Sequence, residues 1–307
     1  MFLGFDTSNY TTSVAFFDGQ KIVQRKKLLE VKEGERGLRQ SDAVFQHTVN
    51  LPVLLNALTE EFDFKAIKSV GVSTRPRNVD GSYMPCFLVG KSSAVCVSSI
   101  AKCPMYKTSH QVGHILAALY SVDRLDLVKE PFIAFHVSGG TTEALLVTPD
   151  DEEIIKAVLI SESTDLKAGQ AVDRAGVMMG LKFPCGAELD KMAQNSGREF
   201  KIKPSMNGLN CSLSGVENKA RKMFENNESN NDIAKFVISY ITETLSEMLE
   251  RITEKYGKMP VVFAGGVSSN SIIKEKIGKK YDAYFAKPEF SCDNAAGIAI
   301  YAYLKSL

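Results

Sequence analysis

Two of the four histidines in this 307-residue chain, His110 and His114, lie four residues apart at the start of an apolar run typical of a helix. A spacing of four places both imidazoles on one helix face, close enough to share a metal ion. An open metal site needs a third ligand, and Asp293, at the start of the last apolar run, offers a carboxylate. The alternative interpretations are two surface histidines on an ordinary helix and an aspartate that caps a helix.

Two glycine-containing turns each follow an apolar segment. They have the sequences Val137-Ser138-Gly139-Gly140-Thr141-Thr142 and Gly265-Gly266-Val267-Ser268-Ser269-Asn270. Glycines let the backbone approach an anion closely, and exposed N–H groups together with hydroxyls can hold a phosphate. The helix expected after the second turn could also hold an anion at its start. The two turns favour a nucleotide site, although each alone is also typical of an ordinary tight turn.

Further polar side chains stand where helices are expected to begin. Asp173 lies early in one predicted helix, and Gly186 and Asp190 lie in the first turns of another. A carboxylate at such a position can accept hydrogen bonds from a ribose, but it can equally stabilise the helix dipole. His136 directly precedes the first glycine turn, where a satisfied core histidine is the alternative to a ligand. His47 is interpreted as structural or solvated.

The composition is that of an ordinary globular protein, with 44% hydrophobic and 24% charged residues. A net charge of +1 gives no overall attraction to nucleic acid or membranes, so RNA binding would need a local basic patch. We find no signal peptide and no apolar run long enough to cross a membrane. Cysteines without a C-x-x-C pair predict reduced thiols in a cytoplasmic protein; they are Cys86, Cys96, Cys103, Cys185, Cys211 and Cys292.

Apolar periodicity and turn residues predict alternating strands and helices. Strands are expected at residues 1–5, 13–17 and 21–29, a helix at 43–62, a strand at 67–73, a helix at 89–101 and a strand at 104–107. After the helix with the two histidines, we expect strands at 132–137, 143–148 and 153–159 and helices at 168–179 and 187–195. Residues 201–209 are interpreted as a loop, followed by helices at 214–226, 232–256, 270–279 and 293–304 and strands at 261–264 and 283–285.

Three strands followed by alternating helices and strands occur twice, which predicts a duplicated α/β architecture with two lobes. The N-terminal lobe is expected to span residues 1–108, with 291–307 returning to it, and the C-terminal lobe residues 109–290. Ligands of such folds bind at strand ends in a cleft between the lobes. The Asp6-Thr7-Ser8 turn and the first glycine turn are predicted to be equivalent turns that face this cleft.

Together, these motifs resemble those of the tRNA threonylcarbamoyladenosine transferase family, formerly described as O-sialoglycoprotein endopeptidases. The resemblance covers essentially the whole chain. Its motifs, in family order, are Asp6-Thr7-Ser8, His110 with His114, Val137-Ser138-Gly139-Gly140, Gly169-Gln170-Ala171-Val172-Asp173, Pro184-Cys185-Gly186, Ser212-Leu213-Ser214-Gly215, Gly265-Gly266-Val267-Ser268-Ser269-Asn270 and Cys292-Asp293-Asn294-Ala295-Ala296. The family implies a duplicated actin-like, Hsp70-like (ASKHA, ribonuclease H-like) α/β fold with two lobes and an interlobe cleft.

The resemblance also implies a site and a reaction. A divalent metal, iron or zinc, would be held by His110, His114 and Asp293, with Asp6 and Asp293 as catalytic carboxylates. ATP, AMP or threonylcarbamoyl-AMP would be bound by His136, Val137, Ser138, Gly139, Gly140, Asp173, Gly186, Asp190 and Asn270. Threonylcarbamoyl would pass from its adenylate to the N6 amine of the adenosine beside the tRNA anticodon, and AMP would leave. The implied partners are tRNA and other subunits, among them a smaller paralogue of the same fold, and no membrane.

Three positions depart from the family's usual residues. Val112 stands where the family has a glutamate between the histidines, Thr141 where a histidine follows the glycines, and Thr11 where the first turn carries a glutamate. Each change removes a polar or ionisable group. The alternative hypotheses are therefore a metal- and nucleotide-binding paralogue that acts as a partner subunit, or one that carbamoylates another acceptor. Peptidase activity is disfavoured, because Gln111 stands where an H-E-x-x-H helix needs its glutamate.

Overall fold

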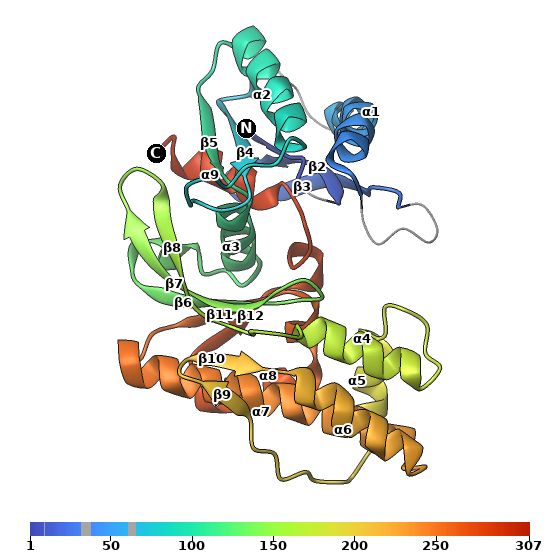
Figure 1. Cartoon of the computed structure of the whole chain (residues 1–307). Helices are drawn as coiled ribbons and strands as arrows, with labels where there is room; N and C mark the ends of the chain where they lie inside the picture. The colour runs from blue at the N-terminus through green and yellow to red at the C-terminus, as the bar shows by residue number, and fades with distance from the viewer. Residues whose placement is uncertain (9, 32–37, 61–65) are drawn as a thin grey trace. The chain divides into compact units, whose positions relative to one another are not determined.

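The computed structural model describes residues 1–8, 10–31, 38–60 and 66–307. The chain folds into two compact units, drawn as a ribbon in Figure 1. The first contains Met1–Lys129, Pro149–Ala157 and Glu289–Leu307, and the second contains Glu130–Thr148 and Val158–Pro288. This division differs from the expected lobes, because residues 109–129, 149–157 and 289–290 belong to the first unit.

The first unit is built on a five-stranded sheet. The strand order is β3 (Ile22–Leu28), β2 (Thr11–Phe17), β1 (Phe2–Asp6), β4 (Ser69–Arg75) and β5 (Met105–Ser109). β1 pairs antiparallel with β2 and parallel with β4, and β4 pairs parallel with β5. Every residue of β1 and β2 is buried, as expected for central strands that are covered on both faces.

Helices cover both faces of this sheet. They are α1 (Gln40–Thr59), α2 (Phe87–Ala101), α3 (His110–Ser121) and α9 (Ala296–Leu304), with the short turn η2 (Leu125–Lys129). Figure 1 shows α1 and α2 on one face and α3 with α9 on the other. The almost entirely apolar α9 packs against β1, β2 and β4 and against α3. The packing against α9 is why α3 belongs to the first unit and not to the second.

A second five-stranded sheet organises the second unit. Its strand order is β12 (Ala283–Phe285), β11 (Val261–Ala264), β6 (Phe132–Val137), β7 (Thr142–Asp150) and β8 (Ile154–Glu162). Its helices are α4 (Ala168–Met178), α5 (Gly186–Gln194), α6 (Ser214–Glu225), α7 (Asn230–Tyr256) and α8 (Ser271–Lys280), with the short turn η3 (Gly266–Ser269). A further short turn, η4 (Pro288–Phe290), lies where the chain passes from the second unit to the first.

The two sheets repeat one topology. The order β8-β7-β6-β11-β12 matches β3-β2-β1-β4-β5 strand for strand. In each sheet the first strand of the repeat pairs antiparallel with the second and parallel with the fourth. The predicted duplicated α/β architecture is therefore confirmed. Asp6, which ends β1, and Ser138, which follows β6, stand at corresponding points of the two repeats.

Two local predictions are wrong. The loop expected over residues 201–209 contains β9 (Ser205–Asn207), which pairs with β10 (Asn210–Ser212). These strands are short and polar, so they lack the apolar alternation that marks a strand. The last helix begins at Ala296 rather than at Asp293, with Ala295 as its N-cap, so Asp293 is not a helix cap. No helix within the described ranges has both the length and the apolarity needed to cross a membrane.

Candidate metal centre and nucleotide-binding turns

Three side chains of the first unit converge on one point. The Nε2 atoms of His110 and His114 lie 2.9 Å apart, and they lie 3.4 Å and 3.2 Å from Oδ1 of Asp293. Ligand atoms of a tetrahedral zinc site are about 3.3 Å apart, because metal–ligand distances are about 2.0–2.1 Å. Two imidazoles and a carboxylate at this separation fit a divalent metal, and three protein ligands leave a coordination position open for substrate.

Asp6 holds the first histidine in place. Its Oδ2 accepts a hydrogen bond of 2.7 Å from Nδ1 of His110, and its Oδ1 accepts one from the backbone N–H of Ser8. The Asp6 side chain is only 1% exposed. A carboxylate on the far nitrogen fixes the tautomer of a metal-binding histidine and makes it a stronger ligand. The structure therefore places Asp6 behind the three candidate ligands, where it orients His110.

The charges of the cluster shift the pKa values of its members. Burial alone would lower the pKa of His110, but the Asp6 and Asp293 carboxylates outweigh it and raise that pKa to about 10. Burial alone would raise the pKa of Asp293, but hydrogen bonds and charge from the two histidines hold it well below its usual value. The cluster thus retains a proton in neutral solution, and a bound metal ion would displace it.

The close approach of α3 and α9 places the ligands. A Cβ atom added to Gly297 would lie 1.8 Å from the carbonyl oxygen of Gly113, so only glycine fits at this contact. α3 begins at His110, where the Oγ of Ser109 accepts a hydrogen bond from the backbone N–H of Val112. Helix α9 begins three residues after Asp293, which leaves that carboxylate in the preceding loop and beside the start of α3.

Two of the departures from the family pattern lie in the first unit and are buried. Val112 is 1% exposed, and a residue two positions from His110 lies on a different side of the helix. The valine therefore leaves the three candidate ligands in place. Thr11 begins β2 and is also buried.

His47 is fully buried, so the solvated interpretation is wrong and the structural one holds. Its Nδ1 lies 2.8 Å from Oγ1 of Thr12, while Nε2 has no hydrogen-bond partner among the described residues. Burial lowers its pKa to about 4, against a smaller opposing influence of Asp6. The imidazole is therefore neutral at pH 7, and it ties α1 to β2.

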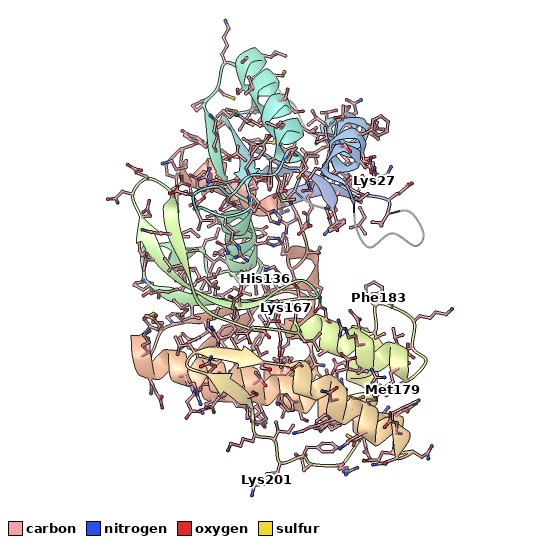
Figure 2. All side chains as sticks on the ribbon, viewed as in Figure 1. Lys27, His136, Lys167, Met179, Phe183 and Lys201 are labelled. Carbon is pink, nitrogen blue, oxygen red and sulfur yellow. The ribbon has the colours of Figure 1, made fainter. Side chains whose placement is uncertain are left out.

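The glycine turns of the second unit lie against one another. A Cβ on Gly169 would lie 2.6 Å from the Cα of Gly139, and the N–H of Gly169 donates to the carbonyl of Ser138. Gly265, with φ +99°, would place a Cβ 2.3 Å from the carbonyl of Val137. Figure 2 labels His136, at the end of β6, near the start of α4. Both predicted turns and the start of α4 thus meet at the carboxyl end of β6.

The remaining predicted nucleotide residues make hydrogen bonds within the second unit. Asp173 accepts from the N–H of Cys185, directly before Gly186. Asp190 accepts from the N–H and hydroxyl of Ser271, directly after Asn270. The side chain of Asn270 caps α8. These contacts give the three polar side chains structural partners, and they order the segments that carry Gly186 and the second glycine turn.

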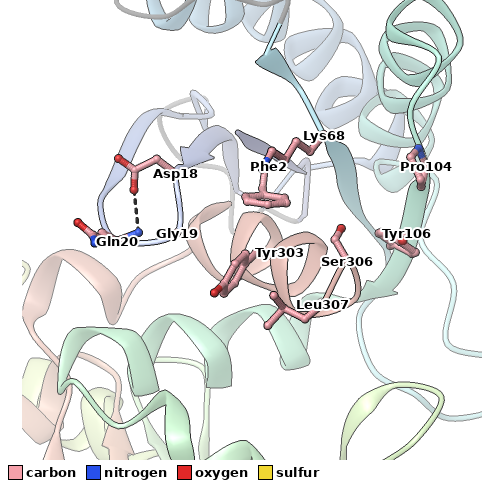
Figure 3. A pocket seen from close by; sticks show the side chains of 10 residues that line it. All are labelled: Phe2, Asp18, Gly19, Gln20, Lys68, Pro104, Tyr106, Tyr303, Ser306 and Leu307. Carbon is pink, nitrogen blue, oxygen red and sulfur yellow. Dashed lines mark hydrogen bonds between the residues drawn. The ribbon is translucent and has the colours of Figure 1, made fainter.

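A cavity of about 790 Å³ lies at the end of the first sheet that is opposite Asp6. Figure 3 shows it lined by Phe2 and by Lys68 and Pro104, which precede β4 and β5. It therefore sits at the amino ends of three strands and contains none of the predicted site residues. Open α/β sheets bind their ligands at the carboxyl ends, where Asp6 stands. This cavity is not the candidate site.

Several contacts at these sites escaped the sequence analysis. The Asp6–His110 pair and the buried Thr12–His47 pair join residues far apart in the chain. A contact between Lys26 and Cys292, close to Asp293, was also missed. A local pattern carries no signal for any of these pairings, because each depends on which strand ends lie side by side.

Known proteins are similar to this chain over nearly its whole length. Residues 23–300 match the family described as TsaD, tRNA N6-adenosine threonylcarbamoyltransferase. The tRNA N6-adenosine threonylcarbamoyltransferase of Riemerella anatipestifer is 30% identical across 99% of this chain and 92% of its own length. Component A of (R)-2-hydroxyglutaryl-CoA dehydratase from Acidaminococcus fermentans has a similar fold, with a TM-score of 0.56 and 15% identity over 99% of this chain and 98% of that one. A ROK family glucokinase from Streptomyces griseus is also similar in fold, with a TM-score of 0.54 and 11% identity over 99% and 98% of the two chains.

Proposed function

This chain belongs to the tRNA N6-adenosine threonylcarbamoyltransferase family, and we propose that it moves threonylcarbamoyl from threonylcarbamoyl-AMP to tRNA. The acceptor is the N6 amine of the adenosine beside the anticodon. The amine forms a bond to the carbamoyl carbon and loses a proton, the bond from that carbon to the phosphate oxygen breaks, and AMP leaves. The observation that carries the proposal is the convergence of His110, His114 and Asp293 beside Asp6.

The first unit would hold the reacting end of the substrate. His110, His114 and Asp293 would bind one divalent ion, iron or zinc, and Asp6 would keep His110 in the tautomer that presents Nε2. When bound, the ion would polarise the carbamoyl carbonyl and stabilise the charge that develops on its oxygen. Asp6 acts through His110 and is a positioning residue in this proposal.

The second unit would hold the AMP portion. The backbone of Ser138, Gly139 and Gly140 would bind the phosphate beside the start of α4, with His136 and Val137 preceding it. The segments carrying Asp173, Gly186, Asp190 and Asn270 would enclose the adenosine. Holding the leaving group in a fixed position removes much of the entropic cost of bringing the two reactants together.

A partner subunit, namely a smaller paralogue of the same fold, is also part of the proposal. Helix α1 supports it, because Phe45, Val49 and Val53 are 69%, 54% and 64% exposed at a spacing of four residues. That spacing puts them on one helix face, and such an apolar stripe is typical of a protein interface. A cytoplasmic location fits the six cysteines, all of which are free thiols.

Complementation tests the proposed function. The gene is expressed in a strain depleted of its own tRNA threonylcarbamoyltransferase, and the modified adenosine is measured in purified tRNA. We expect restored modification from the natural chain and none from Asp293→Ala. A folded, expressed natural chain that restores no modification would instead favour a paralogue that acts as a partner subunit or on another acceptor.

The metal site has a separate test. Protein purified without chelator should contain about one equivalent of iron or zinc, and His114→Ala should lose it, because two ligands hold a metal far more weakly than three. Gln111→Ala, on the same helix, is the matched control and should retain the metal. Elemental analysis measures all three proteins. Equal metal content in the natural chain and His114→Ala would contradict this assignment.

A further inference from the structure

Strand β3 carries a run of three cations, Arg25, Lys26 and Lys27. It lies at the edge of the first sheet. Charged side chains on an edge strand commonly block pairing with other chains, and this explanation would apply to all three residues alike. Successive side chains of a strand point to opposite faces, however, so Lys26 and Lys27 have different surroundings.

The strand register places Lys26 on the face of the metal centre. Asp6 is paired with Ser13, and Ser13 is paired with Lys26. Directly paired residues share a face of the sheet, so all three side chains lie on the face of Asp6. Two strand spacings separate the backbones of Asp6 and Lys26, which is about 10 Å. Asp6, Ser13 and Lys26 therefore form a row across the sheet, from the residue that orients His110 to the lysine of the edge strand.

Lys27 lies on the opposite face. It is paired with Thr12, whose hydroxyl contacts His47 of α1. This face is therefore the one that α1 covers. Figure 2 shows Lys27 at the edge of the sheet near the end of β3. The two adjacent lysines are thus both exposed and carry the same charge, but only Lys26 lies on the face of Asp6.

The ammonium group of Lys26 reaches the segment that carries Asp293. Its Nζ donates to the carbonyl oxygen of Glu289 at 3.2 Å and to Sγ of Cys292 at 2.9 Å. Neither acceptor is a carboxylate, and no ion pair found among the described residues includes Lys26. The exposed ammonium group of Lys26 thus contacts Cys292, which directly precedes the candidate metal ligand Asp293. Its positive charge is still available to bind an anion.

We infer that Lys26 contacts a backbone phosphate of the tRNA when the acceptor adenosine is at the metal centre. This inference rests on the proposed function. A chain with a net charge of +1 needs a local cation to hold a polyanion, and lysine contacts to phosphate position RNA without reading its sequence. The exposure of Lys26 favours a large ligand that arrives from solvent over the small adenylate, which is proposed to be held by the second unit.

The test compares variants of the 307-residue chain. Lys26→Gln and Lys27→Gln are each titrated with an unmodified tRNA transcript over a range of salt concentrations. Removing one phosphate contact should weaken binding several-fold at low salt and reduce the slope of log K against log salt by about 0.7–0.9. We expect this change in Lys26→Gln, whereas Lys27→Gln should keep the slope of the natural chain. Lys26→Arg, which retains the positive charge, should restore both the affinity and the slope. Equal thermal unfolding of the variants confirms that each is folded.

Three results would overturn the inference. One is an equal change in both glutamine variants, which would indicate a general effect of surface charge. Another is an unchanged slope in Lys26→Gln with a raised KM for threonylcarbamoyl-AMP, which would assign the lysine to the small substrate. The third is absence of tRNA binding by the natural chain. Because binding is measured without turnover, the two failures can be told apart. A chain that shows the Lys26-dependent salt slope but fails to transfer threonylcarbamoyl would sink the proposed function, while the contact between Lys26 and a tRNA phosphate would still stand.

Discussion

The hydrogen bond between Asp6 and His110 joins residues that are 104 positions apart. The spacing of His110 and His114 is a property of a single helix, so it could be recognised from the sequence alone. Asp293 could be proposed as a third ligand because of its chemistry. The role of Asp6 could not be predicted from spacing, since it depends on β1 ending beside the first residue of α3.

His47 gives a prediction about pH. Its pKa is about 4 in the folded protein and about 6.5 in an unfolded chain, so only the unfolded chain takes up a proton between these values. The free energy of unfolding should therefore fall as the pH drops from about 6.5 to about 4, by up to about 3 kcal/mol from this residue. Urea unfolding across this pH range measures it. His47→Asn should lack this component, and an identical pH dependence in the variant would show that His47 is not buried in its neutral form.

Among the elements, the contact between α3 and α9 determines where the candidate metal ligands lie. Helical periodicity predicts both helices, but it does not predict that they meet backbone to backbone at Gly113 and Gly297. Helical periodicity also predicts that the last helix starts at Asp293, whereas α9 starts at Ala296. Asn294 accepts from the N–H of Ala296 instead, and Asp293 remains outside the helix. The short polar hairpin of β9 and β10 has no apolar alternation and could not be predicted on that basis.

Gly297→Ala tests this contact. The added methyl group would meet backbone atoms of Gly113 and Ala117, which cannot move without separating the helices. We expect a loss of about 1–3 kcal/mol in unfolding free energy together with weaker metal binding. Gly197→Ala is the control, because nothing lies within 4 Å of its added Cβ, and it should change stability by less than about 0.5 kcal/mol. Chemical denaturation and metal titration measure both variants, and equal behaviour would contradict the proposed role of the contact.

At the scale of the whole molecule, two units that repeat one strand order carry different candidate sites. The candidate metal ligands all lie in the first unit, and the glycine turns all lie in the second. This repeat could be predicted because element order survives even where the residues of the two halves differ. The exact boundary could not, because residues 109–129 join the first unit through packing against the last helix of the chain.

The central claim is that this chain transfers threonylcarbamoyl to tRNA through the cluster of His110, His114 and Asp293. The most direct measurement follows label from threonylcarbamoyl-AMP, made with a labelled threonine, into an unmodified tRNA transcript, with the partner subunits present. The natural chain should place label on N6 of the adenosine beside the anticodon, and Asp293→Ala should lower the rate by at least a hundredfold, or about 2.7 kcal/mol in the barrier. Equal rates in the two proteins, or label that never reaches that adenosine, would contradict the account.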